Sequence, residues 1–397
     1  MVSPAKPESW LKVTEAGLYC EPGDFFVDPA RPVSRAVVTH GHADHARPGH
    51  EAVLATPGTL EIMKARFGAR EIGRQESLEH GQSVTLNGVT VSLAPAGHVL
   101  GSAQAVLEWR GSRVVVSGDY KRRPDATCLP FEVVPCDIFI TEATFGLPVF
   151  RHPPDSEEIG KLLRSVALFP ERCHLVGTYA LGKAQRVIAL LRQAGYDRPL
   201  YLHGALIALC ELYQGLGVDL GDLRPAKGLD KAALQGEIVL APPSALNDRW
   251  SRRLPEPVTA MASGWMRVRA RAKQRGAELP LIVSDHADWD ELTRTLEEVA
   301  PQEVWVTHGN EEALVHYATT RGLPARALAL VGRGEEEQER EVAESAGDAL
   351  PVSATTLRQA QGEAISGENA RQEDVPHPEP VEGEGHPSGR ADEEAES

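Results

Sequence analysis

Short apolar runs separated by turn residues dominate the first 147 residues of the 397-residue chain. Their lengths and their content of β-branched residues are typical of strands. The pair Asn87-Gly88 separates two of these runs and indicates a type I′ hairpin turn. The clearest predicted elements are strands at 83–86, 89–93, 113–117 and 137–140, and one helix at 58–67.

The pattern changes between residues 148 and 279, where helical spacings alternate with short apolar strands. This alternation favours an α/β domain with a largely parallel sheet. From residue 280 the earlier pattern returns, so we interpret 148–279 as an insertion into the first domain. The elements predicted from residue 148 onward are helices at 159–168, 183–193, 205–215 and 289–299, and strands at 174–178, 199–202, 237–241, 258–262, 280–283 and 303–306.

Charge separates the end of the chain from the rest. The net charge of the whole chain is −16, yet residues 332–397 hold 18 acidic and 5 basic residues. The first 331 residues are therefore close to neutral, with 39 acidic and 36 basic residues. Because 332–397 also lacks aromatic residues and is rich in Glu, Gly and Pro, we predict an acidic disordered tail.

The cysteines argue for a reduced environment. The chain has five, widely spaced and without a CxxC pair, which is typical of free thiols in a cytoplasmic protein. The first residues lack the apolar core of a signal peptide. No uninterrupted apolar run is long enough for a membrane span, so we expect no membrane association.

The segment Thr39–His45, with the sequence Thr-His-Gly-His-Ala-Asp-His, follows an apolar run directly. Imidazole nitrogen and carboxylate oxygen are ligands that suit zinc. The spacing of His40, His42, Asp44 and His45 does not fit one face of a helix, but it fits a tight loop after a strand. We interpret the loop as part of a two-metal site; the alternative is a polar surface loop.

Further polar residues of metal-binding type follow other predicted strands. One such residue alone is more often structural, but so many strand ends carrying histidine or carboxylate indicate that one edge of the fold holds the chemistry. These residues are Asp28, His98, Asp119, Glu142, His286 and His308.

Together these motifs resemble the metallo-β-lactamase superfamily. The elements around Glu142, His286 and His308 are similar to the additional motifs of its β-CASP nucleases, and the match covers residues 10–331. The resemblance implies an α/β fold: a metallo-β-lactamase αββα sandwich with an inserted β-CASP α/β domain. The implied boundaries are 1–147 plus 280–331 for the discontinuous first domain, 148–279 for the insertion and 332–397 for the tail.

The resemblance also implies roles for single residues. Asp28 would orient a metal-binding histidine. His286, held by Glu142, would act as the proton donor, and Asp119 and Asp44 would complete the catalytic residues. Two Zn²⁺ ions, or Mn²⁺ in their place, would be held by His40, His42, Asp44, His45, His98, Asp119 and His308, with Asp119 shared.

The implied activity is phosphodiester hydrolysis, which needs positive charge near the phosphate and an activated water, and a two-metal site supplies both. The chain is most similar to bacterial exonucleases associated with DNA ligase. We therefore expect a DNA exonuclease in DNA repair, with nucleic acid as substrate and an ATP-dependent DNA ligase and a helicase as partners. His308 departs from this expectation, because the DNA branch usually has an apolar residue there and the RNA branch a histidine.

Three other functions stay open. An RNA-processing nuclease of the same fold is the first alternative. A small-molecule hydrolase, such as a thioesterase or lactonase, is the second, although it needs neither a large insertion nor the pair Glu142 and His286. A non-catalytic scaffold is the third, although such a protein would have lost ligand residues.

Substrate contacts are expected in the insertion. Lys183 and Arg186 follow a glycine-containing loop at a helix start, where backbone N–H groups suit a phosphate. Ser263 and Gly264 precede a basic run that ends at Arg275, near the predicted junction with the first domain. We predict that these four residues, Lys183, Arg186, Ser263 and Gly264, contact the substrate.

Overall fold

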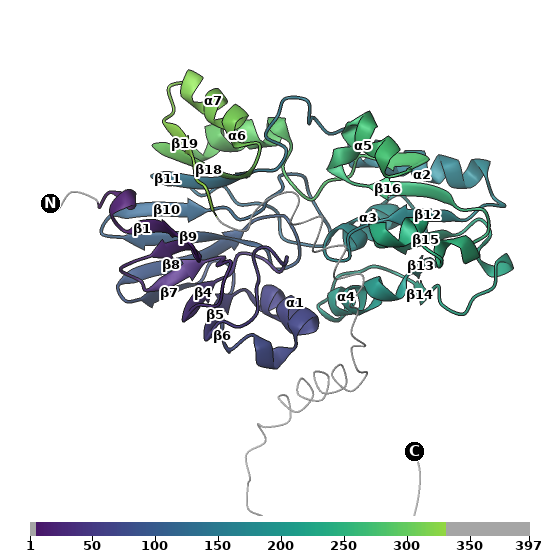
Figure 1. Cartoon of the computed structure of the whole chain (residues 1–397), viewed down its shortest axis with the longest axis horizontal. Helices are drawn as coiled ribbons and strands as arrows, with labels where there is room; N and C mark the ends of the chain where they lie inside the picture. The colour runs from purple at the N-terminus through teal and green to yellow at the C-terminus, as the bar shows by residue number, and fades with distance from the viewer. Residues whose placement is uncertain (1–4, 331–397) are drawn as a thin grey trace, which may run out of the picture. The chain divides into compact units, whose positions relative to one another are not determined.

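The computed structural model describes residues 5–330, and the tail predicted at 332–397 lies outside them. Three sheets organise these residues (Figure 1). The first sheet has six strands, antiparallel at its start and parallel from β3 onward. In spatial order they are β1 (Leu11–Thr14), β2 (Gly17–Cys20), β3 (Phe25–Val27), β4 (Arg35–Val37), β5 (Ala52–Ala55) and β6 (Arg74–Ser77).

The second sheet has seven strands. The predicted hairpin is present, with positive φ at both Asn87 and Gly88. The strands, in spatial order, are β19 (Ala325–Ala327), β18 (Glu303–Gly309), β11 (Ile138–Ala143), β10 (Ser112–Val116), β9 (Ala103–Trp109), β8 (Val89–Pro95) and β7 (Ser83–Leu86).

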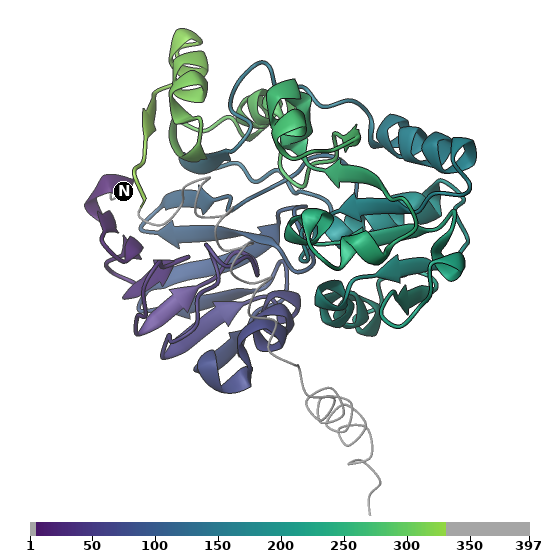
Figure 2. The ribbon, with the colours of Figure 1, turned by 45° about the vertical axis from the view of Figure 1, so that its right-hand side comes forward.

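Apolar residues of the two sheets face each other and form one core, which includes Phe25, Leu54, Leu107 and Val114. Helix α1 (Pro57–Phe67) covers the outer face of the first sheet, through residues such as Met63. The outer face of the second sheet is covered by α6 (Trp289–Val299) and α7 (Glu311–Thr320). The layers are therefore α, β, β and α, as Figure 2 shows from a second angle.

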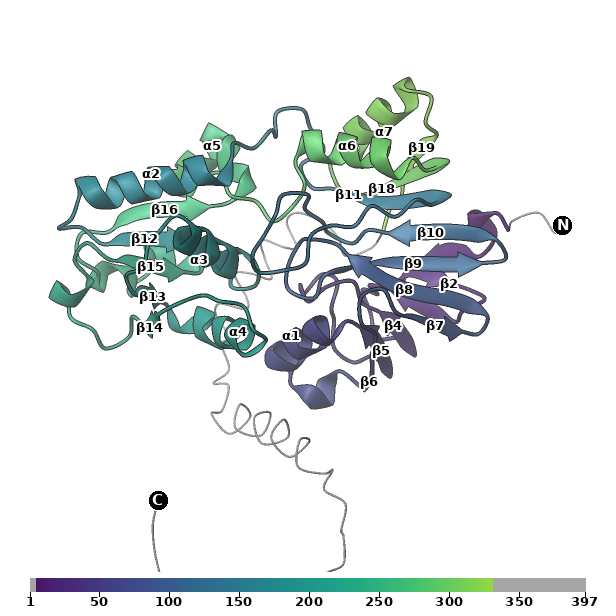
Figure 3. The same cartoon turned by 180° about the vertical axis from the view of Figure 1, so that it is seen from behind.

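The third sheet is built from residues 174–281 only, and all its neighbouring strands are parallel. Figure 3 shows it from behind, with α2, α3 and α4 beside it. Its strands, in spatial order, are β14 (Leu223–Pro225), β13 (Leu200–Leu202), β15 (Ile238–Ala241), β12 (His174–Gly177), β16 (Val258–Ala262) and β17 (Leu279–Leu281). Its helices are α2 (Asp155–Leu168), α3 (Lys183–Gln193), α4 (Gly204–Gly215) and α5 (Arg269–Gln274).

The predicted fold class, an αββα sandwich with an inserted α/β domain, is confirmed. Among the strands and α-helices of the described residues, those that were not predicted are β5, β6, β9, β14, α5, α7 and β19. The domain boundaries at 147–148 and 279–280 stay predictions. None of the helices in residues 5–330 is both long and apolar enough to cross a membrane.

Candidate metal centre

Strand direction explains why distant residues meet. Strand β9 is antiparallel to both β8 and β10, so β8 and β10 run the same way. Strands β11 and β18 are parallel to β10 and to each other. The carboxyl ends of all four strands therefore lie at one edge of the second sheet. The residues just past, or at, these ends are His98, Asp119, Glu142 and His308.

The histidine loop begins after β4 and is fastened to the end of β3. Asp28 accepts hydrogen bonds from the backbone N–H of Thr39 at 2.7 Å and from its hydroxyl at 2.7 Å. It also accepts the Nδ1–H of His45 at 2.8 Å. Asp28 has φ of 44°, which is uncommon outside glycine and is tolerated best by Asp and Asn. The carboxylate thus fixes both the start of the loop and the ring of His45.

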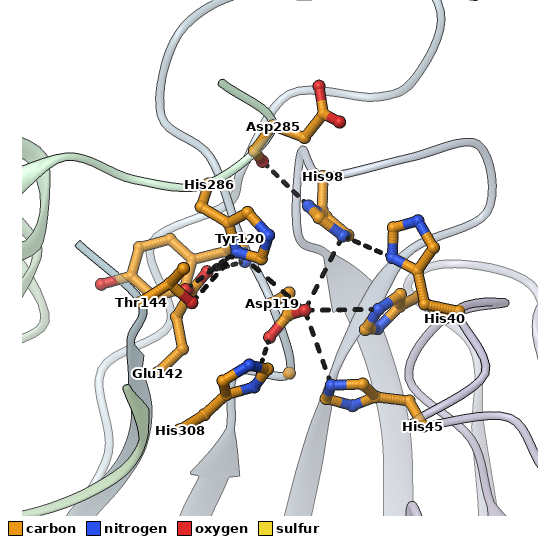
Figure 4. Close-up of polar contacts among 12 residues, drawn as sticks. His40, His45, His98, Asp119, Tyr120, Glu142, Thr144, Asp285, His286 and His308 are labelled. Carbon is orange, nitrogen blue, oxygen red and sulfur yellow. Dashed lines mark hydrogen bonds and ion pairs between the residues drawn. The ribbon is translucent and has the colours of Figure 1, made fainter. Parts of the chain in front are cut away.

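One group of donor atoms comprises His40, His42, His98 and Asp119. Asp119 Oδ2 lies 3.5 Å from His40 Nε2 and 3.8 Å from His98 Nε2 (Figure 4). His42 Nδ1 lies 2.9 Å from His98 Nε2. The four side chains come from two loops of the sandwich and one strand end, and their donor atoms converge.

In His42 and His98, the ring nitrogen that bonds to a backbone carbonyl determines whether the other ring nitrogen carries a hydrogen. His42 Nε2 donates to the carbonyl of Leu181 at 3.3 Å, and His98 Nδ1 donates to the carbonyl of Asp285 at 2.8 Å. A carbonyl can only accept, so in each neutral ring the other nitrogen carries no hydrogen. Two lone pairs therefore face each other at 2.9 Å, an arrangement that a shared cation stabilises.

A second group of donor atoms comprises Asp44, His45, Asp119 and His308. His45 Nε2 lies 3.4 Å from Asp44 Oδ2 and 3.5 Å from Asp119 Oδ2. His308 Nδ1 lies 3.3 Å from the other oxygen of Asp119, Oδ1. His308 has φ of 63°, and such strained positions in non-glycine residues cluster at functional sites.

A third group joins Asp119 to Glu142 and His286. His286 Nδ1 lies 2.9 Å from Glu142 Oε2 and 3.1 Å from Oε1. The backbone N–H of Tyr120 donates to the same carboxylate at 2.7 Å and fixes its orientation. Asp119 Oδ2 lies 4.0 Å from His286 Nδ1, so Asp119 belongs to all three groups.

The electrostatics differ between the histidines. Burial lowers the pKa of His40 and His98 well below the usual value, so both are neutral at pH 7. Burial also acts to lower the pKa of His286, but the carboxylates of Glu142 and Asp119 outweigh it and raise that pKa to about 9. For Asp119, burial acts to raise the pKa, yet the surrounding histidines hold it well below the usual range.

The donor set fits a bound metal. Among the described residues, His40 Nε2, His45 Nε2 and both carboxylate oxygens of Asp119 are buried and have no hydrogen-bond partner. Buried polar atoms without partners are rare and costly. Nitrogen and oxygen donors of this kind are those that zinc prefers. The sequence therefore predicted a set of residues that the structure brings together within one buried cluster.

The four residues that were predicted to contact the substrate are all buried. Lys183 is 4% exposed and its Nζ lies 3.0 Å from Asp285 Oδ2. Arg186 is 1% exposed and pairs with Asp125 and Asp155. Neither cation is on the surface, as a contact with a nucleic-acid phosphate requires.

Ser263 and Gly264 are buried as well. The Ser263 hydroxyl accepts the backbone N–H of Trp265 and caps a short helix at Gly264–Arg267. A side chain at Gly264 would meet the ring of Phe145 at 2.4 Å. The geometry thus gives structural roles to all four residues and no support to their predicted contact with substrate.

Several contributors to the site escaped prediction. The carbonyls of Leu181 and Asp285 carry no residue-type signal, because every residue has a carbonyl. The hydroxyl of Thr144, 3.4 Å from His286 Nδ1, was not singled out either. Thr39 stood within the predicted loop, but its two hydrogen bonds to Asp28 depend on a contact between strands β3 and β4.

The αββα layers and the convergent histidines and carboxylates define a metallo-hydrolase. Comparison with known families agrees: residues 280–321 match a family described as "Zn-dependent metallo-hydrolase RNA specificity domain". This matched segment contains both His286 and His308. A solved structure from Enterococcus faecalis V583, described as a protein of unknown function, has a similar fold, with a TM-score of 0.52 over 74% of this chain and 79% of that chain at 12% identity.

The chain is similar to relatives of at least two kinds. A protein named "Probable DNA ligase" from Opitutus terrae is 32% identical over 355 residues, which is 85% of this chain and 33% of that protein. An endoribonuclease from Aspergillus fumigatus is 33% identical over 31% of this chain and 15% of its own length. Cleavage and polyadenylation specificity factor subunit 3 from Dictyostelium discoideum is 32% identical over 36% of this chain and 19% of its own length.

The chain thus spans a third of the length of the ligase relative and less than a fifth of the other two. The fold, the donor cluster, the matched family and these relatives agree on one assignment. The chain belongs to the metallo-β-lactamase superfamily and, within it, to the β-CASP family.

Proposed function

We propose that this protein is a metal-dependent nuclease that hydrolyses DNA from strand ends, as an exonuclease in DNA repair. The observation that carries the proposal is the position of Asp119, which belongs to all three donor groups. Two groups are rich in metal-ligating atoms, and the third has a histidine paired with a carboxylate. A phosphodiester hydrolase needs a metal site and a proton donor side by side.

In this proposal one Zn²⁺ is held by His40, His42, His98 and Asp119, and a second by Asp44, His45, His308 and Asp119. Zinc bound there supplies positive charge to the phosphate oxygens and lowers the pKa of a water molecule at the site. Mn²⁺ is an alternative occupant, because the carboxylates of Asp44 and Asp119 are ligands that suit it.

The protein's own side chains supply the proton that the leaving oxygen needs. Glu142 accepts the Nδ1–H of His286 and sets the ring orientation, which leaves Nε2 as the nitrogen that passes a proton to the leaving oxygen. Tyr120 in turn holds Glu142 through its backbone N–H. Asp28 holds the ring of His45 in the same way, by accepting its Nδ1–H.

DNA is favoured as the substrate by the extent of similarity. The relative named as a probable DNA ligase matches 85% of this chain, whereas the endoribonuclease matches 31%. A ligase and a helicase as partners, and a cytoplasmic location, belong to the same proposal. A ligase domain on the same chain, or on a separate protein, would supply the joining step.

An RNA-processing nuclease is the second candidate, and His308 favours it. Its Nδ1 lies 3.3 Å from Asp119 Oδ1, so the histidine takes part in the donor cluster. It also lies in the segment that matches the family named for RNA specificity. A small-molecule hydrolase has no comparable observation in its favour.

The deciding experiment offers purified protein, loaded with zinc or manganese, four labelled substrates of matched sequence. These are linear single-stranded DNA, duplex DNA, single-stranded RNA and circular single-stranded DNA. Shortening of linear DNA, with circular DNA intact, is the expected result. Degradation of RNA alone would refute the DNA assignment, and rapid cutting of circular DNA would refute the exonuclease assignment. A D119N sample prepared in parallel excludes a contaminating nuclease.

A further inference from the structure

A buried ion pair joins the third sheet's helix α3 to the segment that follows β17. Lys183, the first residue of α3, lies with its Nζ 3.0 Å from Asp285 Oδ2. The two residues are 4% and 5% exposed. At this degree of burial each charge depends on the other, because an unpaired buried charge costs free energy.

Both partners of this pair also control backbone carbonyls at the metal centre. The carbonyl of Asp285 accepts the Nδ1–H of His98 at 2.8 Å. The carbonyl of Leu181 accepts the Nε2–H of His42 at 3.3 Å and the backbone N–H of Lys183 at 3.0 Å. Of the two carbonyls that orient histidines of this donor group, Asp285 thus supplies one and Lys183 bonds to the other.

The loop before α3 is shaped to reach this position. Gly182 has φ of 81°, and a side chain there would lie 2.4 Å from the side chain of Val99, beside His98. Only glycine permits this approach and this backbone conformation. The N–H of Gly182 is also tied to the side chain of Gln185 at 2.8 Å, so the loop is held from the helix side as well.

We propose that Lys183 is a positioning residue of the metal centre, whose ion pair with Asp285 holds the carbonyls that orient His42 and His98. This inference rests on the proposed metal-dependent function. It assigns Lys183 a role different from a phosphate contact. It also gives the inserted region a role in the metal centre, because the carbonyl of Leu181 orients His42.

The position of the hydrogen on each ring is the physical link. A carbonyl that receives the outer N–H of a metal-binding histidine fixes the tautomer and the ring orientation, and loss of such a partner typically weakens metal binding about 10- to 100-fold. The weakening of metal binding should be confined to the subsite of His40, His42 and His98. The subsite of Asp44, His45 and His308 receives its orienting contact from Asp28 and not from Lys183.

The test measures zinc affinity by competition with a chelating indicator, in wild type and in K183M, K183R and D155N. We expect wild type to bind two zinc equivalents, and K183M to bind one of them about 10- to 100-fold more weakly. K183R keeps the charge and should recover most of the affinity. D155N is the matched control, because it disturbs a neighbouring ion pair of Arg186 on α3 that touches no ligand-orienting carbonyl.

A double variant guards against misfolding. K183M/D285N removes both charges and leaves neither unpaired, and it should show the same weakening as K183M alone. Unchanged affinity for both zinc ions in K183M and in the double variant would overturn the inference while the metal centre stands. Equal weakening in D155N would also overturn it, because the loss would then be general. Failure of wild type to bind zinc would instead refute the proposed metal centre.

Discussion

Two clusters of charged and polar side chains lie close together in this protein and behave in opposite ways. The metal centre gathers histidines and carboxylates whose inner atoms face one another, and the described residues supply no hydrogen-bond partners for His40 Nε2 or for Asp119. The cluster around α3 gathers charges that each meet an opposite charge, although Arg186 Nε and Asp285 Oδ1 also lack a hydrogen-bond partner among the described residues. Arg186 contacts both Asp125 and Asp155, and Lys183 contacts Asp285.

The difference between them is the group that faces each carboxylate, which is a lysine or arginine in the cluster around α3 and a histidine in the metal centre. A buried polar group that is fully paired stabilises and orients its surroundings. A buried group that lacks partners costs free energy unless a ligand supplies what is missing. The comparison therefore separates a site that needs an occupant from a network that needs none, and substitutions in the two clusters should fail in different ways.

The largest expected effect is that of D119N. The amide keeps the shape of the carboxylate but loses the charge that faces three groups of donors. We expect loss of bound zinc from both subsites and a fall in nuclease activity of at least about 10³-fold. Metal analysis after dialysis and a nuclease assay measure the two effects. Two retained zinc ions would contradict the shared role of Asp119.

A smaller effect, confined to turnover, is expected for H286A. If His286 donates the proton to the leaving oxygen, the variant keeps both metal ions and loses about 10²- to 10⁴-fold in rate. A substrate with a better leaving group, such as a nitrophenyl phosphodiester, should suffer much less, because it needs no proton. An equal loss on both substrates, or fewer than two ions in the variant, would show that His286 has a different role.

For Arg186, in the cluster around α3, we expect a substitution to lower the stability of the fold without weakening zinc binding. R186M removes the cation that Asp125 and Asp155 share, but Lys121 still pairs with Asp125 and Arg123 still lies near Asp155. We therefore expect a loss at or below the lower end of the about 3–5 kcal/mol that breaking a buried ion pair costs in the free energy of unfolding. Chemical denaturation measures the loss, and R224M, in an exposed ion pair, is the control that should shift the midpoint little. Below the midpoint the variant should bind zinc as wild type does. Zinc loss in folded R186M would erase the distinction between the two clusters.

This contrast also explains what could be read from the sequence. The loop at 40–45 and the later histidines were predictable, because metal-ligating residue types recur at strand ends and the strand order brings those ends together. Lys183 and Arg186 lie at the predicted helix start, but their burial was not predictable, because a helix start with two cations looks the same in sequence whether its partners are phosphates or carboxylates. Their partners Asp125, Asp155 and Asp285 are distant in sequence, and only the folded structure pairs them.

The same limit applies to the fold. Strands with a clear apolar pattern, such as β10 and β16, were predicted at nearly the observed positions. Strand β6 was missed because its sequence, Arg-Gln-Glu-Ser, has no apolar residue. Its position depends on pairing with β5 at the edge of the first sheet. Edge strands of this kind obtain their structure from a neighbour and leave little local signal.

The smallest expected effect is that of His50, a buried histidine outside both clusters, which tests whether burial alone keeps a histidine neutral. Its Nδ1 accepts the backbone N–H of Val33 at 3.2 Å, so the ring must be neutral at that atom. Burial lowers the pKa of His50 to about 4, below the value of about 6.5 in an unfolded chain. The unfolded chain therefore binds the proton first. The stabilisation is complete above pH 6.5 and is lost as the pH falls toward 4.

H50N keeps an acceptor where Nδ1 stood and removes the titration. Metal-free wild type should lose about 1 kcal/mol more than H50N in the free energy of unfolding when the pH falls from 7.5 to 5.5. Urea denaturation at both pH values measures the difference, and the comparison between proteins cancels the titration of the metal-binding histidines. Parallel losses in the two proteins would mean that His50 is protonated without cost. Burial would then not be enough to hold a histidine neutral in this fold, and the lone pairs that face each other at His42 and His98 would need another explanation.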